Sequence, residues 1–154
     1  MKAITVNGNE YKLEFSFEAA ECKDFIKKMF DVASGAILVK NAQDMSKPTQ
    51  KDMIDGSASM VAEIPHICIT GFYAGLLENN PVSQEEAKTL MKTYMKENKL
   101  SFVKLYEELK QCMEDDGFFE LSGLTDMLNS MNDTAEEKIA KIPQDHRKKQ
   151  TGTK

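Results

Sequence analysis

The dipeptide Asn7-Gly8 is the feature that most constrains how this chain folds. Asn-Gly favours the type I′ turn of a two-residue β-hairpin, because both positions accept positive φ. Apolar residues alternate with polar ones on either side of it, at Ile4 and Val6 before the turn and at Tyr11, Leu13, Phe15 and Phe17 after it. A two-residue turn sets Val6 opposite Asn9 and Ile4 opposite Tyr11, which puts both apolar sets on one face. The sequence therefore predicts an antiparallel hairpin over residues 1–17.

A helix over residues 18–34 is predicted next, with Ser16 as its N-cap. Its apolar residues recur at steps of three and four, at Cys22, Phe25, Ile26, Met29, Phe30 and Ala33. Ser34-Gly35 is expected to end it. Residues 40–51 are polar and contain Pro48, which predicts a mobile connecting loop.

The remaining helical body is predicted over residues 52–131. Its first helix begins near Thr49 or Gly56 and reaches Leu77, and residues 58–77 are apolar on nearly every side. Pro65 is expected to kink or split this helix because it has no amide hydrogen. Glu63, Pro65 and His66 lie at the centre of the apolar stretch, which favours a buried core helix over a membrane span.

Three more helical segments follow. Ser83-Gln84-Glu85-Glu86 is a capping box, and it precedes an amphipathic segment through Met95. Ser101 is expected to cap a helix that ends at Asp115-Asp116-Gly117 and whose inner residues are Leu105, Leu109, Cys112 and Met113. Helical spacing resumes from Leu121 to Met131, and Thr134 could cap a last turn or two before Pro143.

The fold class expected from these segments is mainly α (α+β). It consists of an N-terminal β-hairpin followed by a bundle of about five helices in one domain, residues 1–142. Residues 143–154 are predicted to be a disordered basic tail.

Charge is unevenly placed along the chain. The formal net charge is −5, yet residues 138–154 hold six Lys and Arg against Asp145 alone, which leaves −10 on residues 1–137. An acidic body is a poor surface for the phosphates of nucleic acid. We therefore expect no nucleic-acid partner and, given the polar centre of residues 58–77, no membrane partner.

Residues that could run a reaction are sparse. His66 and His146 are the only histidines, and His66 is predicted to be buried and satisfied, with Glu63 as a conceivable hydrogen-bonding partner. Cys22, Cys68 and Cys112 are odd in number and widely spaced, which suits neither disulfides nor a metal site and indicates a reducing compartment. We therefore predict no catalytic, cofactor-binding or metal-binding residues, and no enzyme.

An acidic, apolar segment is the best candidate for function. Between Gln111 and Glu137 there are eight acidic residues and no basic one. The interleaved apolar stripe is predicted to bind a partner, and it consists of Phe118, Phe119, Leu121, Leu124, Met127, Leu128 and Met131. An acidic rim around a Met-rich stripe suits a basic amphipathic helix. The alternative is that this stripe closes the protein's own core.

Residues 1–20, MKAITVNGNEYKLEFSFEAA, resemble the opening of tail assembly chaperones from long-tailed phages and prophages of Gram-positive bacteria. The resemblance covers about 35 residues. It implies a non-enzymatic protein of the host bacterial cytoplasm, absent from the mature virion. Such a protein keeps the tape measure protein soluble and helps recruit tail tube subunits. It can also form homo-oligomers. The family often has a longer form made by frameshifting.

A second hypothesis is a small acidic regulatory binder, such as an inhibitor or antitoxin, that acts on a single protein partner. It predicts one partner at fixed stoichiometry. A tape measure chaperone should instead bind as many copies along one client.

Overall fold

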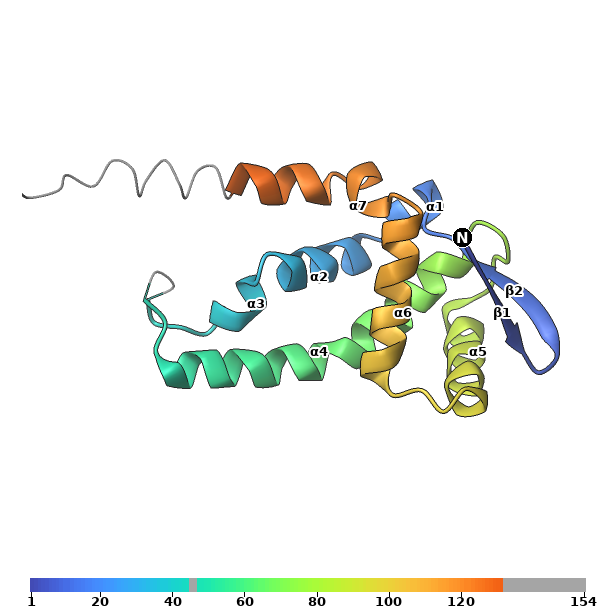
Figure 1. Ribbon diagram of the computed structural model, residues 1–154, viewed down its shortest axis with the longest axis horizontal. Coiled ribbons are helices and arrows are strands. Elements are labelled where there is room, and N and C mark those ends of the chain that lie inside the picture. The colour runs from blue at the N-terminus through green and yellow to red at the C-terminus, as the bar shows by residue number, and fades with distance from the viewer. Residues whose placement is uncertain (45–46, 132–154) are drawn as a thin grey trace, which may run out of the picture.

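The computed structural model describes residues 1–44 and 47–131, and it is mainly α with an N-terminal two-stranded hairpin, as predicted (Figure 1). The elements in chain order are β1 (Lys2–Val6), β2 (Asn9–Leu13), α1 (Phe17–Ala20), α2 (Lys23–Ala33), α3 (Ala36–Val39), α4 (Gln50–Leu76), α5 (Gln84–Glu97), α6 (Phe102–Asp115) and α7 (Phe118–Leu121). Residues 124–131 are also helical. The last helical turn expected from Thr134 and the predicted tail, 143–154, lie outside the described residues.

The hairpin has the predicted register. β1 and β2 are antiparallel, with Ile4 opposite Tyr11 and Val6 opposite Asn9. Asn7 and Gly8 both have positive φ, at 51° and 76°, as a type I′ turn requires. The inner face is buried against the helices, and a hydrogen bond of 2.8 Å from the Glu14 amide to the Gly75 carbonyl ties the end of the hairpin to α4.

The hairpin is shorter than residues 1–17, because β2 ends at Leu13. Phe17 does not continue the alternation: it is 75% exposed and begins α1. Phe15 is buried as predicted, but it lies outside the strand.

The single helix predicted over residues 18–34 is wrong, because Glu21 and Cys22 separate α1 from α2. Ala19 and Phe25 are both buried, yet on one continuous helix they would point about a third of a turn, or about 120°, apart. The break turns both toward the core. Ser16 does not cap with its side chain either, since its hydroxyl donates to Glu78.

The predicted end of that helix at Ser34-Gly35 is confirmed, with Gly35 at a φ of +70°. The short helix α3 follows at once and was not predicted.

α4 is the element around which the others are arranged, and it contacts α1, α2, α3, α5, α6 and β2. Its 27 residues begin after a capping box between Thr49 and Asp52, so the predicted loop 40–51 is two residues too long. Pro65 does not split it. The helix is continuous and changes direction about midway along its length (Figure 1).

The two halves of α4 have different surroundings. The C-terminal half is largely buried, and Ile67, Cys68, Phe72 and Leu76 are among its core residues. The N-terminal half extends with α3 away from the hairpin and α5 (Figure 1). We call α3 and residues 50–62 of α4 the arm, and the rest of the described chain the body.

The core of the body is centred on three phenylalanine rings. Phe15, Phe25 and Phe118 come from the end of the hairpin, α2 and α7, and their ring centroids lie 5.5 to 6.0 Å apart. α5 and α6 also contribute buried side chains to this core. Both follow the prediction: the capping box of Ser83 and Glu86 is present, and the four predicted inner residues of α6 are buried.

Candidate protein-binding surface

The apolar stripe predicted to bind a partner is divided between the core and the surface. Phe118 and Leu124 are only 0% and 3% exposed, so both are core residues and offer a partner almost no surface, contrary to the prediction. Phe119 and Leu128 are half-buried. The stripe residues that lie on the surface are Leu121, Met127 and Met131.

Two glycines explain this division. Gly117 and Gly123 both have positive φ, and each interrupts the helix at its position. The breaks point Phe118 toward Phe15 and Phe25, and they bury Leu124 within the same core cluster. Periodicity along the chain does not reveal which residues of a stripe a fold turns inward.

The acidic residues near this stripe are largely engaged within the chain. The Asp116 side chain is nearly buried and accepts a hydrogen bond of 2.8 Å from the Phe15 amide. Glu114 pairs with Lys110, Asp115 accepts from Gln111, and Glu120 accepts from Thr125. Asp133, Glu136 and Glu137 lie outside the described residues. Several carboxylates of the predicted acidic rim therefore make hydrogen bonds or ion pairs within the chain.

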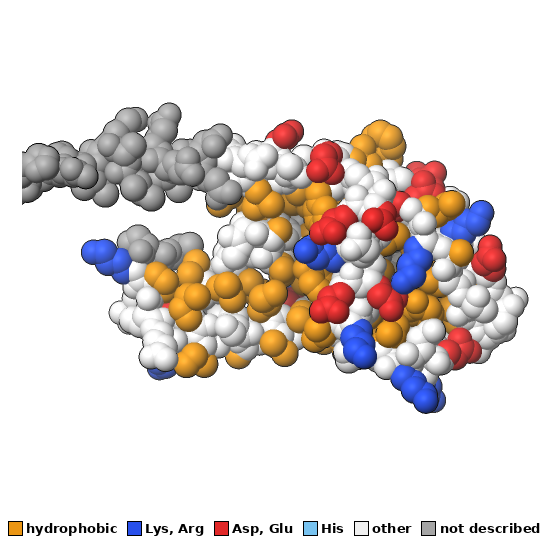
Figure 2. Space-filling model, in the orientation of Figure 1, with side chains coloured by type: hydrophobic (Ala, Val, Ile, Leu, Met, Phe, Trp, Pro, Cys, Tyr) orange, Lys and Arg blue, Asp and Glu red, His pale blue; other side chains and the backbone are white. Residues whose placement is uncertain are grey.

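A second apolar surface, on the arm, was not predicted. We define the arm face as six exposed, uncharged residues of α4: Met53, Ile54, Ser57, Ala58, Val61 and Ala62. Ile54 and Val61 are 61% and 64% exposed. Asp55 is the only charged residue from 53 to 62. Figure 2 shows hydrophobic side chains along this half of α4.

The arm face continues a face of α4 that is covered in the body. Ile54, Val61 and Cys68 recur every seven residues, so they lie on the same side of the helix. Cys68 is fully buried, and its thiol donates to the Phe102 carbonyl of α6 at 3.3 Å. The same side is therefore covered by a helix near Cys68 and uncovered near Ile54. The sequence indicated a buried helix here because its composition is apolar. Composition does not reveal which part of a helix its neighbours cover.

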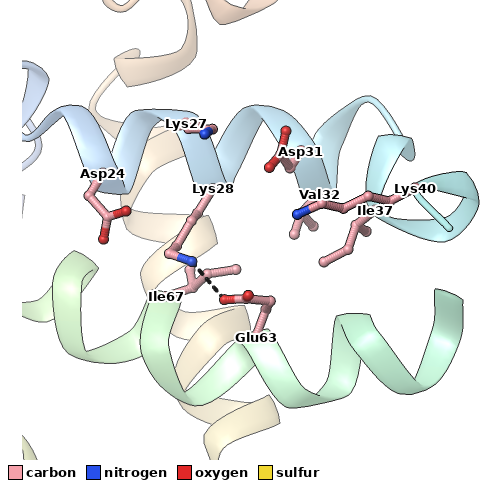
Figure 3. A pocket seen from close by; sticks show the side chains of 9 residues that line it. All are labelled: Asp24, Lys27, Lys28, Asp31, Val32, Ile37, Lys40, Glu63 and Ile67. Atoms are coloured by element: carbon pink, nitrogen blue, oxygen red, sulfur yellow. Dashed lines mark hydrogen bonds and ion pairs between the residues drawn. The ribbon is translucent and has the colours of Figure 1, made fainter. Parts of the chain in front are cut away.

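The residues weighed for catalysis do not converge. His66 is about half exposed, so its predicted burial is wrong, and its partner is Asp24 at 2.8 Å instead of Glu63. Glu63 pairs with Lys28, also at 2.8 Å (Figure 3). Hydrogen bonds from His66 and Lys28 respectively hold the pKa values of the Asp24 and Glu63 carboxyls below their ordinary range. Both pairs join α2 to α4.

Cys68 lies apart from these pairs. Burial raises the pKa of its thiol to about 12, so the sulfur is protonated at neutral pH and a poor nucleophile. Cys22 and Cys112 are also free thiols whose pKa values are raised, chiefly by burial.

The pocket between α2, α3 and α4 has a volume of about 100 Å³ (Figure 3). Lys27, Lys28 and Lys40 line it together with Asp24, Asp31 and Glu63, so charges of both signs alternate around it. The ion pair of Lys28 and Glu63 spans it. Within residues 1–44 and 47–131, no group of three His, Cys, Asp or Glu side chains is placed to hold a metal ion. In the same ranges no helix is long and apolar enough to cross a bilayer.

Comparisons with known proteins give no match. No family model, no curated protein and no solved structure is similar to this chain at a significant level.

Proposed function

We propose that this chain binds another protein through the arm face. The observation that carries the proposal is a helix face of uncharged, mainly apolar side chains with no covering element among the described residues. Contiguous exposed apolar surface of this kind is typical of interaction sites in proteins that remain soluble. Burying Ile54 and Val61 under a partner would contribute about 1.5 kcal/mol or more from each side chain.

A helix is the partner that fits this face best. Small side chains at Ser57, Ala58 and Ala62 lie beside the larger Ile54 and Val61, so a second helix could approach closely. In the body, α6 already lies over the continuation of this face at Cys68. A client helix would cover the arm as α6 covers the body.

The N-terminal resemblance suggests which helical client this is. We propose a phage tail assembly chaperone that binds and solubilises the tape measure protein and helps recruit tail tube subunits in the bacterial cytoplasm. The resemblance depends on the N-terminal hairpin, and that hairpin is present with the register expected from the sequence. No chemical step is required of such a protein.

Co-expression with a tape measure protein tests the proposal. The variant Ile54→Gln with Val61→Gln should lower the soluble yield of the client and weaken binding at least about tenfold, because two apolar contacts are lost. The matched control is Thr89→Gln with Lys92→Gln, at solvent-facing positions of α5, and it should bind as the wild type does. Equal binding by both variants would exclude the arm face.

The stoichiometry of the complex tests the second hypothesis. A regulatory binder, which the charge of −10 on residues 1–137 favours, should form a complex with one partner at a fixed ratio. A chaperone of a long helical client should bind in several copies along it. Light scattering of the purified complex separates the two outcomes.

A further inference from the structure

We propose that a groove on the side of α2 away from α4 docks an acidic amphipathic helix of a partner protein. The α2 groove is formed by Lys23, Ile26, Lys27, Phe30, Leu124 and Met127. It is distinct from the arm face, so this inference does not depend on the proposed client.

The shape and the floor of the groove suit a helix. Its volume is about 400 Å³, and Ser122, Gly123, Leu124 and Met127 form the wall opposite α2. Ile26 and Phe30 are one turn apart on α2 and half-buried, and Met127 is 55% exposed. The floor is thus apolar and accessible, as in grooves that bind one face of an amphipathic helix.

The charge of the groove specifies its occupant. Lys23 and Lys27 are the only charged side chains that line it, and both are exposed. Within residues 1–44 and 47–131 neither makes an ion pair. Lys28, by contrast, points to α4 and pairs with Glu63, and the Asp24 carboxylate near Lys27 is bonded to His66.

Two ammonium groups one turn apart therefore border an apolar floor whose lining holds no carboxylate. Lys27 also borders the pocket that contains Asp24, Asp31 and Glu63. A helix with Asp or Glu beside its apolar face would supply those carboxylates. This is the opposite of the basic partner helix that the acidic composition of residues 111–137 predicted.

Such rim charges affect selectivity more than affinity. Exposed ion pairs are weak and are screened by salt, but like charges across an interface disfavour the wrong partner and slow its association. Preference for an acidic helix should therefore be strongest at low ionic strength.

Two designed peptides test the inference on the full-length chain. Both are amphipathic helices of about four turns with the same leucines, and they differ only in carrying Glu or Lys beside the apolar face. In ¹⁵N spectra the Glu peptide should shift the amides of Ile26, Phe30, Gly123 and Met127. It should bind at least about tenfold more tightly than the Lys peptide in low salt, and the difference should shrink as salt is added.

Charge reversal supplies the decisive variant. Lys23→Glu with Lys27→Glu should reverse the preference between the two peptides. Lys92→Glu with Lys96→Glu, an exposed pair with the same spacing on α5, should leave it unchanged. Circular dichroism of both variants checks that the fold is retained.

Three results would overturn the inference. The first is equal binding of the two peptides, and the second is amide shifts that fall elsewhere on the chain. The third is a mass that doubles with concentration and returns to that of one chain in Met127→Gln, because a second copy would then occupy the groove.

Discussion

At Gly56 the backbone of α4 lies directly against the backbone of α3. A β-carbon there would be 2.0 Å from the Leu38 carbonyl oxygen, which is backbone and does not move aside as a side chain does. Gly56→Ala should therefore separate α3 from α4 and lower the free energy of opening of the arm by about 1–3 kcal/mol. Hydrogen exchange of the α3 amides should become faster. Ser57→Ala, at the next and exposed position, is the control and should be neutral or slightly stabilising.

Burial of Cys68 and Tyr94 predicts a loss of stability in alkali. Their pKa values rise from 9.0 and 10.0 to about 12, by burial first and, for Tyr94, also by its hydrogen bond to Glu108. Between about pH 9 and about pH 12 the unfolded chain holds fewer protons than the folded one. The free energy of unfolding should thus be retained below about pH 9 and fall above it.

Urea denaturation at a series of alkaline pH values measures this. Cys68→Ala should show a shallower decline than the wild type, whatever its stability at neutral pH. An equally steep decline would mean that the Cys68 thiol does not contribute.

Leu124 and Met127 should respond oppositely to the same substitution. Leu124→Asp places a carboxylate in the core and should cost about 3 kcal/mol or more, with loss of cooperative unfolding. Met127→Asp alters an exposed side chain and should change stability by less than about 0.5 kcal/mol. Thermal melts followed by circular dichroism compare them. Similar melting temperatures would contradict the burial of Leu124.

Among single residues, side-chain partners that are far apart along the chain could not be predicted from the sequence. His66 and Asp24 are 42 positions apart, so the nearby Glu63 was the plausible partner and the wrong one. The inner residues of α6 were predicted correctly because one face of that helix is buried along its whole length.

Among the elements, α4 and α5 both begin with a capping box, but the two capping boxes lie in different surroundings. Thr49 with Asp52, and Ser83 with Glu86, each form a complete capping box. α5 packs into the core through Ala87, Met91 and Tyr94, whereas the start of α4 is the end of the arm.

Removing each cap should therefore have different consequences. Ser83→Ala should lower the global free energy of unfolding by about 0.5–2 kcal/mol. Thr49→Ala should leave it almost unchanged and speed hydrogen exchange only in the first turns of α4. Urea titration and exchange measured on both variants distinguish the two cases. An equal global loss would show that the arm and the body unfold together.

Elements with a complete local signal were predictable from the sequence. The Asn-Gly turn fixed the hairpin register, and the capping box of Ser83 and Glu86 fixed the start of α5. The break between α1 and α2 and the short helix α3 were not predicted, because burial of Ala19 and the contact at Gly56 depend on tertiary packing.

The whole molecule consists of a body with one aromatic core and an arm that projects from it (Figure 1). Two candidate binding surfaces result, the arm face on α4 and the α2 groove. Of the predicted stripe, only Leu124 and Met127 line either surface. Composition did not identify the arm face, because exposure of that face depends on which part of α4 the other helices cover.

α4 is about 40 Å long at the usual rise per residue. Its tip is consequently remote from the three phenylalanine rings that hold the fold together. Under the proposed function, a client bound to the arm could be exchanged while the core stays intact, and a single copy could serve many rounds of binding without refolding.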